Sequence, residues 1–471
     1  MFSKLSKEET NKLKNYKYSV IDDSLTTWLF NDSWNILASK IPKSWIPNWI
    51  SASGFLSIVI AFIFRDIPVI SGIFILIYQT LDALDGKHAR NQKLNSPIGE
   101  LIDHSFDAFS TPLVMIIISN WLGFNNLLTV GIVNLAQIFF LKVQYDARID
   151  NYLYFSFFSS GEFLTFFGLF GFYLGNNVLN YNYYVDLLNI YSWNISIILT
   201  LISYLFFLYS SRLYLDLSSF NILLLSIGNL FESNIESIIS YGAIFSGLAC
   251  EAILCKMIKR NKISEITIYL VVLKYLLTNK NNNLIILLGL IYNYYICKAA
   301  ADSLDMSLWR RNLNIYVDGV FDCIHYGHMT LFEKAKNITL LRSIRPDLFE
   351  KNYIDPHCRV IVGVPNDNDN ETYKRPNIYN LELKIDTLNY IKNISDIIPN
   401  APGKPGELNK DFINNNKIYA VVHGDDASDE LIEKYYKGAI DCNNLILTPR
   451  ESKYNISTSQ IIKKATEIGE N

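Results

Sequence analysis

Long apolar segments, separated by short polar links, fill the chain from Trp45 to about Ala300. Each is close to the roughly 20 residues that a helix needs to cross a bilayer. The segment NISIILTLISYLFFLYSS, for example, lacks the charges at a period of 3.6 residues that a surface helix of a soluble protein would carry. We therefore expect a polytopic α-helical membrane domain at residues 44–300 with about ten transmembrane helices. Their centres are expected near Ser57, Phe74, Met115, Val133, Phe167, Thr200, Leu224, Ser246, Val271 and Leu288.

Composition and charge narrow the function classes. Half of the residues are hydrophobic and the formal net charge is -3, so no basic excess supports binding to nucleic acid. Six cysteines without a C-x-x-C pair predict reduced thiols.

Residues 1–43 have no signal-peptide core and are expected on the cytosolic side or at the interface. The basic stretches Lys87–Lys93 and Lys256–Lys262 favour the cytoplasmic side for the links that carry them.

Beyond Ala300 the pattern changes to short β-like runs such as NIYVDGV, RVIVGV and KIYAVVHG, which alternate with helical stretches. This alternation predicts a parallel, Rossmann-like α/β nucleotidyltransferase domain at residues 314–471. A short polar linker at 301–313 would keep it close to the membrane. An insertion at about 338–357 has no role that the sequence assigns.

Four aspartates gather in the run DALDGKHARNQKLNSPIGELIDHSFD. Asp82 and Asp85 are three residues apart, and Asp103 and Asp107 are four apart, so each pair would share one face of a helix. Carboxylates at the ends of apolar helices are too costly for packing alone and normally line a functional cavity. Oxygen donors without thiols suit Mg²⁺ or Mn²⁺, which can bridge two phosphates of a substrate. Arg90 would balance phosphate charge.

The spacing D-x2-D-G-x2-A-R-x8-G-x3-D-x3-D is matched at all eight fixed positions and resembles the CDP-alcohol phosphatidyltransferase family. YKYS, PNWISASG and YQTLDALDGKHAR, within residues 10–110, resemble the eukaryotic choline and ethanolamine phosphotransferases. The resemblance implies that Asp107 shares the metal site and takes the proton of a diacylglycerol hydroxyl, with His104 as the alternative base. The implied metal ligands are Asp82, Asp85, Asp103 and Asp107, and the implied substrate contacts are Asn48, Gly86 and Arg90.

Glu162 is a further acid in the membrane half, within the apolar block SSGEFLTFFG. It could support the carboxylate site or take a proton. The alternative is a residue at a helix end that points to water.

In the second half, NIYVDGVFDCIHYGHMTLFEKAK predicts a strand, a glycine-containing turn and a helix that begins near His328. The N–H groups and the positive dipole at a helix start can hold a phosphate. His325 and His328 would donate to phosphate oxygens whose charge grows in the transition state, while Gly327 keeps the turn open for a nucleotide. Zinc is the alternative for this histidine pair, but no acid or cysteine cluster nearby completes four ligands.

Near the C-terminus, ISTSQII places Ser457, Thr458 and Ser459 at the start of another helix, either as an ordinary cap or as phosphate ligands. Together with H-x-G-H, this segment resembles the cytidylyltransferases that make CDP-choline, CDP-ethanolamine or CDP-glycerol, over about 314–464. The resemblance implies that Lys374 clamps the phosphates of CTP. It implies further substrate contacts by Asp367, toward the ammonium group, and by His423 and Arg450.

Several positions depart from that family. Lys384 stands where the family has an arginine, and a single ammonium does not reproduce a bidentate guanidinium. Arg450 precedes ISTS by more residues than the family's arginine does. Gly403 follows Pro402 where choline-type relatives carry a tryptophan, which favours phosphoethanolamine over phosphocholine, because trimethylammonium groups are usually held by aromatic faces.

These observations predict a fused two-step enzyme in which CTP and phosphoethanolamine give CDP-ethanolamine, which then reacts with diacylglycerol to give phosphatidylethanolamine and CMP. One alternative is the same pair of steps with phosphocholine. Another is an active phosphotransferase with a regulatory, nucleotide-binding C-terminal domain, and a third makes the membrane half an anchor. We expect an integral membrane protein of the endoplasmic reticulum, with both sites facing the cytosol because CTP is cytosolic. The resemblance also implies a homodimer.

Overall fold

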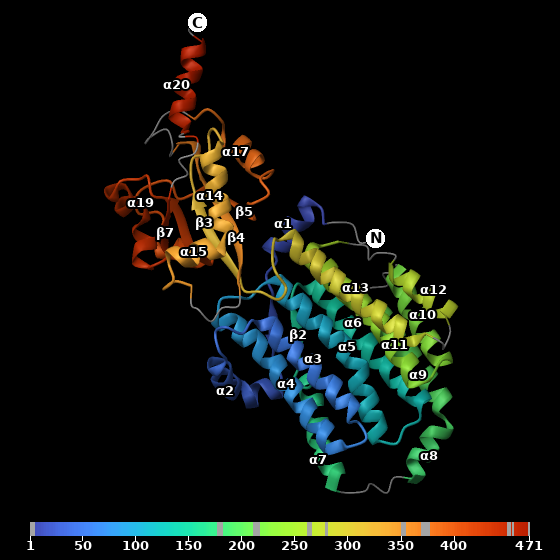
Figure 1. Ribbon diagram of the computed structural model, residues 1–471. Helices are drawn as coiled ribbons and strands as arrows, with labels where there is room; N and C mark the ends of the chain where they lie inside the picture. Colours follow the sequence, from blue (N-terminus) through green and yellow to red (C-terminus); the bar gives the residue numbers. More distant parts are fainter. Residues whose placement is uncertain are drawn as a thin grey trace. The chain divides into compact units, whose positions relative to one another are not determined.

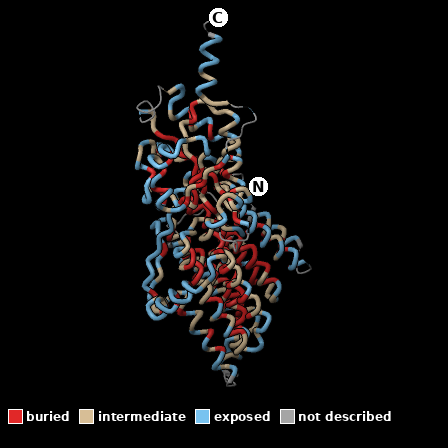
Figure 2. The backbone as a smooth tube through the Cα atoms, turned by 60° about the vertical axis from the view of Figure 1, so that its left-hand side comes forward, coloured by how far each residue is buried: buried red, intermediate tan, exposed pale blue. Residues whose placement is uncertain are grey.

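The computed structural model describes residues 5–176, 182–210, 217–260, 266–277, 281–349, 355–368, 377–449, 454 and 456–469. The chain divides into two compact units, Met1–Ser303 and Leu304–Asn471 (Figure 1). Buried backbone is concentrated inside each of them (Figure 2).

Helices make up nearly all of the first unit. In chain order they are α1 (Lys7–Asn15), α2 (Leu25–Lys40), α3 (Pro47–Ile63), α4 (Pro68–Asn91), α5 (Pro97–Trp121), α6 (Asn126–Asp150), α7 (Ser160–Asn176), α8 (Asn182–Ile190), α9 (Ser192–Ser210), α10 (Leu217–Phe231), α11 (Ile235–Ile258), α12 (Ile266–Leu277) and α13 (Asn282–Ser303). Two short strands, β1 (Val20–Asp22) and β2 (Leu153–Phe155), pair in parallel and tie the N-terminal segment to the link after α6.

All ten expected centres lie in helices, and six helices of the described chain are long and apolar enough to cross a membrane: α4, α5, α6, α9, α11 and α13. The expected number of about ten spans was therefore too high by this measure. The physical reason is length, since α3 and α7 have 17 residues each, α10 has 15 and α12 has 12, short of the roughly 20 that a bilayer requires. The first unit is an integral membrane domain.

Helix α11 lies at the centre of this bundle, where 94% of its apolar window is buried. It packs against α5, α6 and α13. Small residues permit the close approach: a Cβ added to Gly242 of α11 would lie 2.8 Å from the Pro112 ring of α5. The packing therefore holds α5, which carries two of the four aspartates, against the most buried helix of the bundle.

The second unit is a parallel α/β domain, as the sequence predicts. Its strands are β3 (Asn312–Asp318), β4 (His357–Pro365), β5 (Asp396–Ala401), β6 (Ile418–Gly424) and β7 (Leu445–Thr448), in the spatial order β5-β4-β3-β6-β7. Its helices are α14 (Tyr326–Lys336), α15 (Ile338–Ile344), α17 (Leu381–Leu388), α18 (Lys410–Asn415), α19 (Asp429–Asp441) and α20 (Thr458–Gly469). The strand order reverses direction between β3 and β6, and ligands of such sheets bind beyond the carboxyl ends of the strands at that point.

The unassigned insertion is part of this domain's framework. Phe349 is fully buried in the core beside the sheet. Arg345 donates to the carbonyl oxygens of Leu445 (2.6 Å) and Asn443 (3.1 Å), next to β7, and the Tyr419 hydroxyl donates to the carbonyl of Leu348 at 2.5 Å. These contacts give the insertion a structural role.

Asp305, just after α13, anchors the start of the second unit. Its carboxylate accepts from Lys336 at 2.8 Å and from the Ser395 hydroxyl, and lies 3.2 Å from the His357 ring. Burial alone would raise the pKa of Asp305, but the hydrogen bonds from His357, Lys336 and Ser395 outweigh it and hold the pKa well below its ordinary value.

We expect Asp305→Asn to destabilise the second unit by about 1–2 kcal/mol at pH 7, because a charged hydrogen-bond acceptor is lost. A carboxyl whose folded-state pKa is depressed stabilises above its unfolded pKa of about 4, and this stabilisation is lost as the pH falls through the folded value. The difference in melting temperature between wild type and variant should therefore shrink below about pH 4. A constant difference from pH 7 to pH 3 would contradict this, and the exposed Asp386→Asn serves as control.

Candidate functional site

The four aspartates of the membrane unit meet in two pairs across α4 and α5. A short turn at 92–96 reverses the chain between the two helices. The carboxyl groups of Asp82 and Asp107 lie close enough to interact directly. The carboxyl groups of Asp85 and Asp103 are placed in the same way. Because α4 and α5 run antiparallel, the pair on α4 and the pair on α5 face each other and form one group of four carboxyl groups.

Neighbouring side chains orient this group. The Ser51 hydroxyl of α3 donates to Asp85, which is only 6% exposed. The Tyr78 hydroxyl of α4 donates to Asp107 at 2.6 Å, and Nδ1 of His104 lies 3.4 Å from the other oxygen of Asp107. The carboxyl groups are therefore held in place by α3, α4 and α5.

The donor set fits a divalent cation. One ligand atom each from Asp103, His104 and Asp107 lies within 4.8 Å of the others. Carboxylates at such short separations repel one another unless protons or a cation lie between them. Hard oxygen donors favour Mg²⁺ or Mn²⁺ over softer metals. Of the four aspartates expected as metal ligands, Asp103 and Asp107 belong to this group, together with His104. Asp82 and Asp85 lie beside them on α4, and their role as metal ligands stays a prediction.

The other expected contacts of the membrane site also lie near its rim. A Cβ on Gly86 would be 3.3 Å from Nη1 of Arg90, so the exposed guanidinium folds back over this glycine. A Cβ on Gly99 would be 3.8 Å from Oδ1 of Asn48, so α3 and α5 meet at that point. A Cβ at Gly86 would push the Arg90 guanidinium aside by a few tenths of an ångström, whereas a Cβ at Gly99 would make ordinary van der Waals contact with Asn48.

Tyr16 and Tyr18 of the YKYS segment also lie beside α5, and the sequence analysis gave neither of them a role. The Tyr16 hydroxyl donates to Glu100 at 3.0 Å, and Lys256 of α11 donates to the same oxygen at 2.9 Å. The Tyr18 ring lies 6.4 Å from that of His104. Burial and nearby carboxylates, Glu100 first, raise the pKa of both tyrosines, so their hydroxyls stay protonated and can donate. In the sequence, the only indication of a role for these residues is the pair of tyrosines in YKYS, a segment that resembles the choline and ethanolamine phosphotransferases.

Glu162 does not point to water. Its carboxylate accepts from the backbone and hydroxyl of Thr26 at 2.6 and 2.8 Å, and from the backbone and hydroxyl of Ser159 at 2.6 and 2.7 Å. These bonds join the start of α2 to the start of α7. A role for Glu162 in taking a proton stays a prediction.

In the second unit, His325 and His328 lie at the start of α14, at the carboxyl end of β3. Their rings stack with centroids 4.0 Å apart. Nδ1 of His325 accepts from the backbone N–H of Gly327 at 3.1 Å, and Nδ1 of His328 accepts from the backbone N–H of His325 at 3.4 Å. In the neutral rings this places the proton of each on Nε2, which makes Nε2 a donor.

The C-terminal segment meets this helix start. A Cβ on Gly327 would lie 4.0 Å from the carbonyl oxygen of Ile456, and the rings of Tyr326 and Tyr454 are 4.9 Å apart. The ISTS segment is therefore beside H-x-G-H, although the two are more than 120 positions apart in sequence.

Ser457 is also a helix cap. Its hydroxyl accepts from the backbone N–H of Gln460 at 3.3 Å, and the Gln460 side chain accepts from the backbone N–H of Ser457 at 2.9 Å. This is the reciprocal capping pattern of S-x-x-Q, with Thr458 and Ser459 in the first turn of α20. Lys374 and Arg450 lie outside the described residues.

Asp367 lies in an ion-pair network with Lys384. The ammonium of Lys384 is 3.2 Å from Asp367 and 3.4 Å from Asp322, and it donates to Asn377 at 2.8 Å. The second oxygen of Asp367 accepts from the backbone N–H of Leu381 at 2.8 Å. Lys384 is fully buried, so the residue that replaces the family's arginine holds the domain's own carboxylates.

His423 lies at the carboxyl end of β6, on the other side of the sheet's switch point from His325. Its ring is 4.9 Å from that of Tyr436, whose hydroxyl donates to Asp318 at 2.7 Å. The sequence analysis did not name Asp318 or Tyr436 as candidate site residues. The DGVFD stretch before H-x-G-H carried the signal for Asp318, whereas Tyr436 comes from α19 and is identified only by the fold.

Two family models match this chain, one in each unit. The family model described as CDP-alcohol phosphatidyltransferase matches residues 44–202, and the one described as cytidylyltransferase-like matches residues 316–464. The chain contains a CDP-alcohol phosphatidyltransferase domain followed by a cytidylyltransferase-like domain.

Several curated proteins are similar to part of this chain. Human ethanolaminephosphotransferase 1 is 31% identical over 126 residues, which cover 22% of this chain and 32% of that protein. Choline/ethanolaminephosphotransferase 2 of Arabidopsis thaliana is 35% identical over 115 residues, and the match covers 21% of this chain and 30% of that protein. Cholinephosphotransferase 1 of Xenopus laevis is 33% identical over 123 residues, and the match covers 23% of this chain and 31% of that protein. The chain thus spans about a third of the length of these relatives.

We expect Lys384→Met to destabilise the second unit by about 3–5 kcal/mol, because it leaves Asp322, which is 3% exposed, without its buried partner cation. Lys392→Met, at an exposed position nearby, should cost less than about 0.5 kcal/mol. Thermal unfolding of both variants checks the difference. Equal melting temperatures would show that the Lys384 network does not hold the domain together.

Proposed function

We propose that this chain makes phosphatidylethanolamine in two successive reactions, one in each unit. The observation that carries the proposal is the presence, on one chain, of an assembled carboxylate site and of a histidine pair at a nucleotide-binding switch point. One site is suited to consuming a CDP-alcohol, and the other to making it. Tethering them raises the local concentration of the shared intermediate.

In the first reaction, a phosphate oxygen of phosphoethanolamine attacks the α-phosphorus of CTP, and the bond to diphosphate breaks. Nε2–H groups of His325 and His328 and the N–H groups at the start of α14 would donate to the oxygens whose charge grows. Supporting this role, both Nδ1 atoms are already engaged by backbone N–H groups. Ser457, Thr458 and Ser459 lie on the segment that meets this helix, and we assign them, with His423, Asp367, Lys374 and Arg450, to the binding of CTP and phosphoethanolamine.

In the second reaction, the hydroxyl oxygen of diacylglycerol attacks the β-phosphorus of CDP-ethanolamine, loses its proton, and CMP leaves. Asp82, Asp85, Asp103 and Asp107 would hold a divalent cation, which when bound neutralises charge on the two phosphates. Asp107 is our first candidate for the proton acceptor, because Tyr78 fixes one of its oxygens and leaves the other facing His104. His104 is the alternative acceptor.

Asn48, Gly86 and Arg90 would contact the CDP group at the rim of the same site. Their positions support this assignment, since Arg90 folds over Gly86 and Asn48 lies beside Gly99. We place both sites on the cytosolic side of the endoplasmic reticulum, where CTP is available, and propose a homodimer.

Ethanolamine is favoured over choline by the loop that contains Gly403. The Glu407 carboxylate accepts from the backbone N–H groups of Gly403 and Lys404, both at 3.0 Å. An acidic group rather than the tryptophan of choline-type relatives thus occupies this loop, which suits a primary ammonium better than a trimethylammonium.

One observation favours a second candidate function. Buried Lys384 is committed to Asp322 and Asp367 and therefore does not reach phosphates as an exposed arginine would. In this alternative the second unit binds CTP or a CDP-alcohol and regulates an active phosphotransferase without making the intermediate.

Two variants separate the reactions in the full-length protein. Asp103→Asn should lower lipid formation from supplied CDP-ethanolamine on the order of a thousandfold while CDP-ethanolamine is still made from CTP, because cation binding contributes several kcal/mol. His328→Ala should show the reverse pattern, with a loss of about a hundredfold in CDP-ethanolamine formation. Asp146→Asn, which removes only the ion pair with Lys142, is the matched control.

The two-step proposal fails if wild type binds CTP but releases no diphosphate with either phosphoethanolamine or phosphocholine. That result would support the regulatory alternative.

Substrate choice is tested by competition. With CTP, Mg²⁺, diacylglycerol and equal phosphoethanolamine and phosphocholine, we expect phosphatidylethanolamine to exceed phosphatidylcholine by about tenfold, because one mismatched ammonium contact costs about 1–2 kcal/mol. Mass spectrometry of the lipid product gives the ratio. A predominance of phosphatidylcholine would assign the enzyme to choline instead.

A further inference from the structure

Helix α2 (Leu25–Lys40) exposes large apolar side chains, although it is not one of the six helices that can cross a membrane. Leu29 is 53% exposed, Ile36 57% and Leu37 44%. Exposed apolar side chains of a membrane protein can face water, another protein surface or lipid. The position and the faces of α2 indicate which of these it meets.

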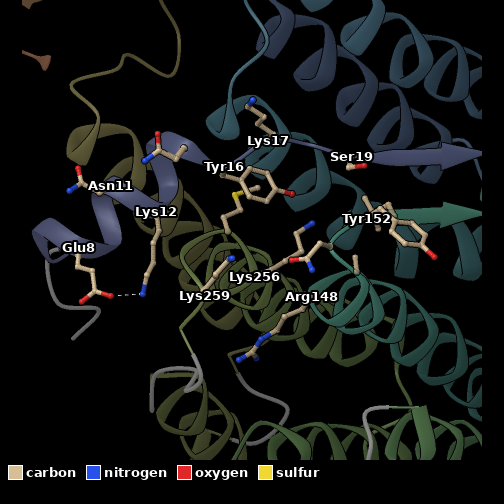
Figure 3. A pocket seen from close by; sticks show the side chains of 15 residues that line it. Glu8, Asn11, Lys12, Tyr16, Lys17, Ser19, Arg148, Tyr152, Lys256 and Lys259 are labelled. Carbon is tan, nitrogen blue, oxygen red and sulfur yellow. Dashed lines mark ion pairs between the residues drawn. The ribbon is translucent and has the colours of Figure 1, made fainter. Parts of the chain in front are cut away.

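Contacts around Lys256 fix the path of the chain before α2. Lys256, near the end of α11, donates to Glu100 at the start of α5 at 2.9 Å and to Gln144, near the end of α6, at 3.4 Å. Tyr16 donates to the same oxygen of Glu100. Figure 3 shows Tyr16 and Lys256 around one space with Tyr152, which precedes β2. The segment from α1 to β1 therefore passes over the ends of α6 and α11.

Both ends of α2 lie at this same end of the bundle. Strand β1, just before α2, pairs with β2, which follows α6, and Thr26 donates to Glu162 at the start of α7. Beyond α2, the carbonyl oxygen of Trp45 lies 2.9 Å from Nε2 of His88, near the end of α4. A helix with both ends on one side does not cross the bilayer. The 16 residues of α2, about 24 Å long, therefore lie along the surface of the unit.

The docked face of α2 consists of Trp34 and Ala38. Both are buried against Ile50 of α3 and Leu84 of α4. Successive residues are about 100° apart around a helix, so the exposed residues on the two sides of this face form two separate sectors.

A polar face lies on one side of the docked face and contains Asn31, Asp32 and Asn35. Lys87 of α4 donates to Oδ1 of Asn31 at 2.5 Å and to Oδ1 of Asn35 at 3.0 Å. Trp28, which is 79% exposed, belongs to the same face near the start of the helix. Tryptophan side chains are enriched at the boundary between membrane and water. The polar face is therefore suited to that boundary.

An apolar face lies on the other side of the docked face. Leu29, Ile36 and Leu37 fall within a sector of about 100°. Ser33 and Lys40 share this sector. Lys40 is the last residue of the helix, and its side chain is long enough to reach the surface from there.

The order of contacts along α4 gives the orientation of these faces. Leu81 packs beside the docked face, Leu84 is buried under it, and Lys87 reaches the polar face. Because α4 is a span that ends at Asn91, Lys87 lies nearer the water and Leu81 nearer the middle of the bilayer. The polar face of α2 is thus turned toward water, and the apolar face toward the acyl chains.

The surface of α4 next to α2 is also apolar. Leu81 lines a groove of about 300 Å³ together with Ile73 and Ile77 of α4 and Phe172 of α7. The one hydroxyl in its lining, that of Thr80, donates to the backbone of its own helix. This groove belongs to the outer surface of a span, so the apolar face of α2 is continuous with a surface that already faces lipid.

From this geometry we infer that α2 is an interfacial helix that lies in the surface of the bilayer, with Leu29, Ile36 and Leu37 among the acyl chains. Its partner is the lipid bilayer that holds the spans. Helices of this kind bury their apolar face by about 5–10 Å at the boundary between headgroups and acyl chains. The inference is independent of the proposed two-step function, since it does not depend on either reaction.

The test uses full-length protein in nanodiscs of phosphatidylcholine, with a nitroxide spin label on one introduced cysteine. Leu29→Cys places the label on the apolar face, and Asn35→Cys places it on the polar face of the same helix. Leu37→Cys repeats the apolar measurement at a second position. Cys323→Ser and Cys442→Ser remove the two native cysteines that are only partly buried, while the other four are buried.

Electron paramagnetic resonance then compares collisions of the label with oxygen, which concentrates among acyl chains, and with a nickel complex that stays in water. We expect the labels at 29 and 37 to prefer oxygen, at a depth of about 5–10 Å below the lipid phosphates, and the label at 35 to prefer the nickel complex. A preference for nickel at all three positions would place α2 in water. Protection of the labels at 29 and 37 from both reagents would mean that protein covers this face, as in a dimer, and either result overturns the inference.

Discussion

The pairing of carboxyl groups across α4 and α5 is the constraint on which the membrane unit depends. Asp82 meets Asp107 and Asp85 meets Asp103, and such contacts between like charges persist only where a cation or protons separate them. The surrounding structure maintains this arrangement: the turn at 92–96 sets the register of the helices, α3 supplies a hydroxyl to Asp85, and the buried α11 supports α5 from behind. The carboxyl groups thus depend on the packing of α3, α4, α5 and α11 around them.

The candidate site of the second unit differs in chemistry from the carboxylate site. It presents neutral donors rather than carboxylates: two histidines whose Nδ1 atoms are occupied, and the N–H groups of a helix start beside the C-terminal segment. The reversal of strand order between β3 and β6 brings His325 and His423 to one edge of the sheet. A phosphate-rich nucleotide suits such an edge, whereas a cation suits the carboxylates. The two units are therefore complementary parts of one proposed pathway.

Sequence spacing was sufficient to find the helix faces of the aspartates, the α/β domain and the two motifs, because each depends on local periodicity. It could not show the crosswise pairing of Asp82 with Asp107, which depends on the turn between helices. Nor could it show that Lys384 is buried against Asp322 and Asp367, since that contact joins three separate segments. The number of spans was overestimated because apolar content was visible in the sequence, while the helix ends were not.

The most direct test of the account is Mn²⁺ binding to the full-length protein, followed by electron paramagnetic resonance with Asp85→Asn/Asp103→Asn beside wild type. The account predicts saturable binding in wild type and in the Asp146→Asn control, and a loss of that binding in the double variant, because two facing ligands are removed at once. Equal Mn²⁺ binding by the double variant and wild type would show that the α4–α5 carboxyl groups do not form a cation site.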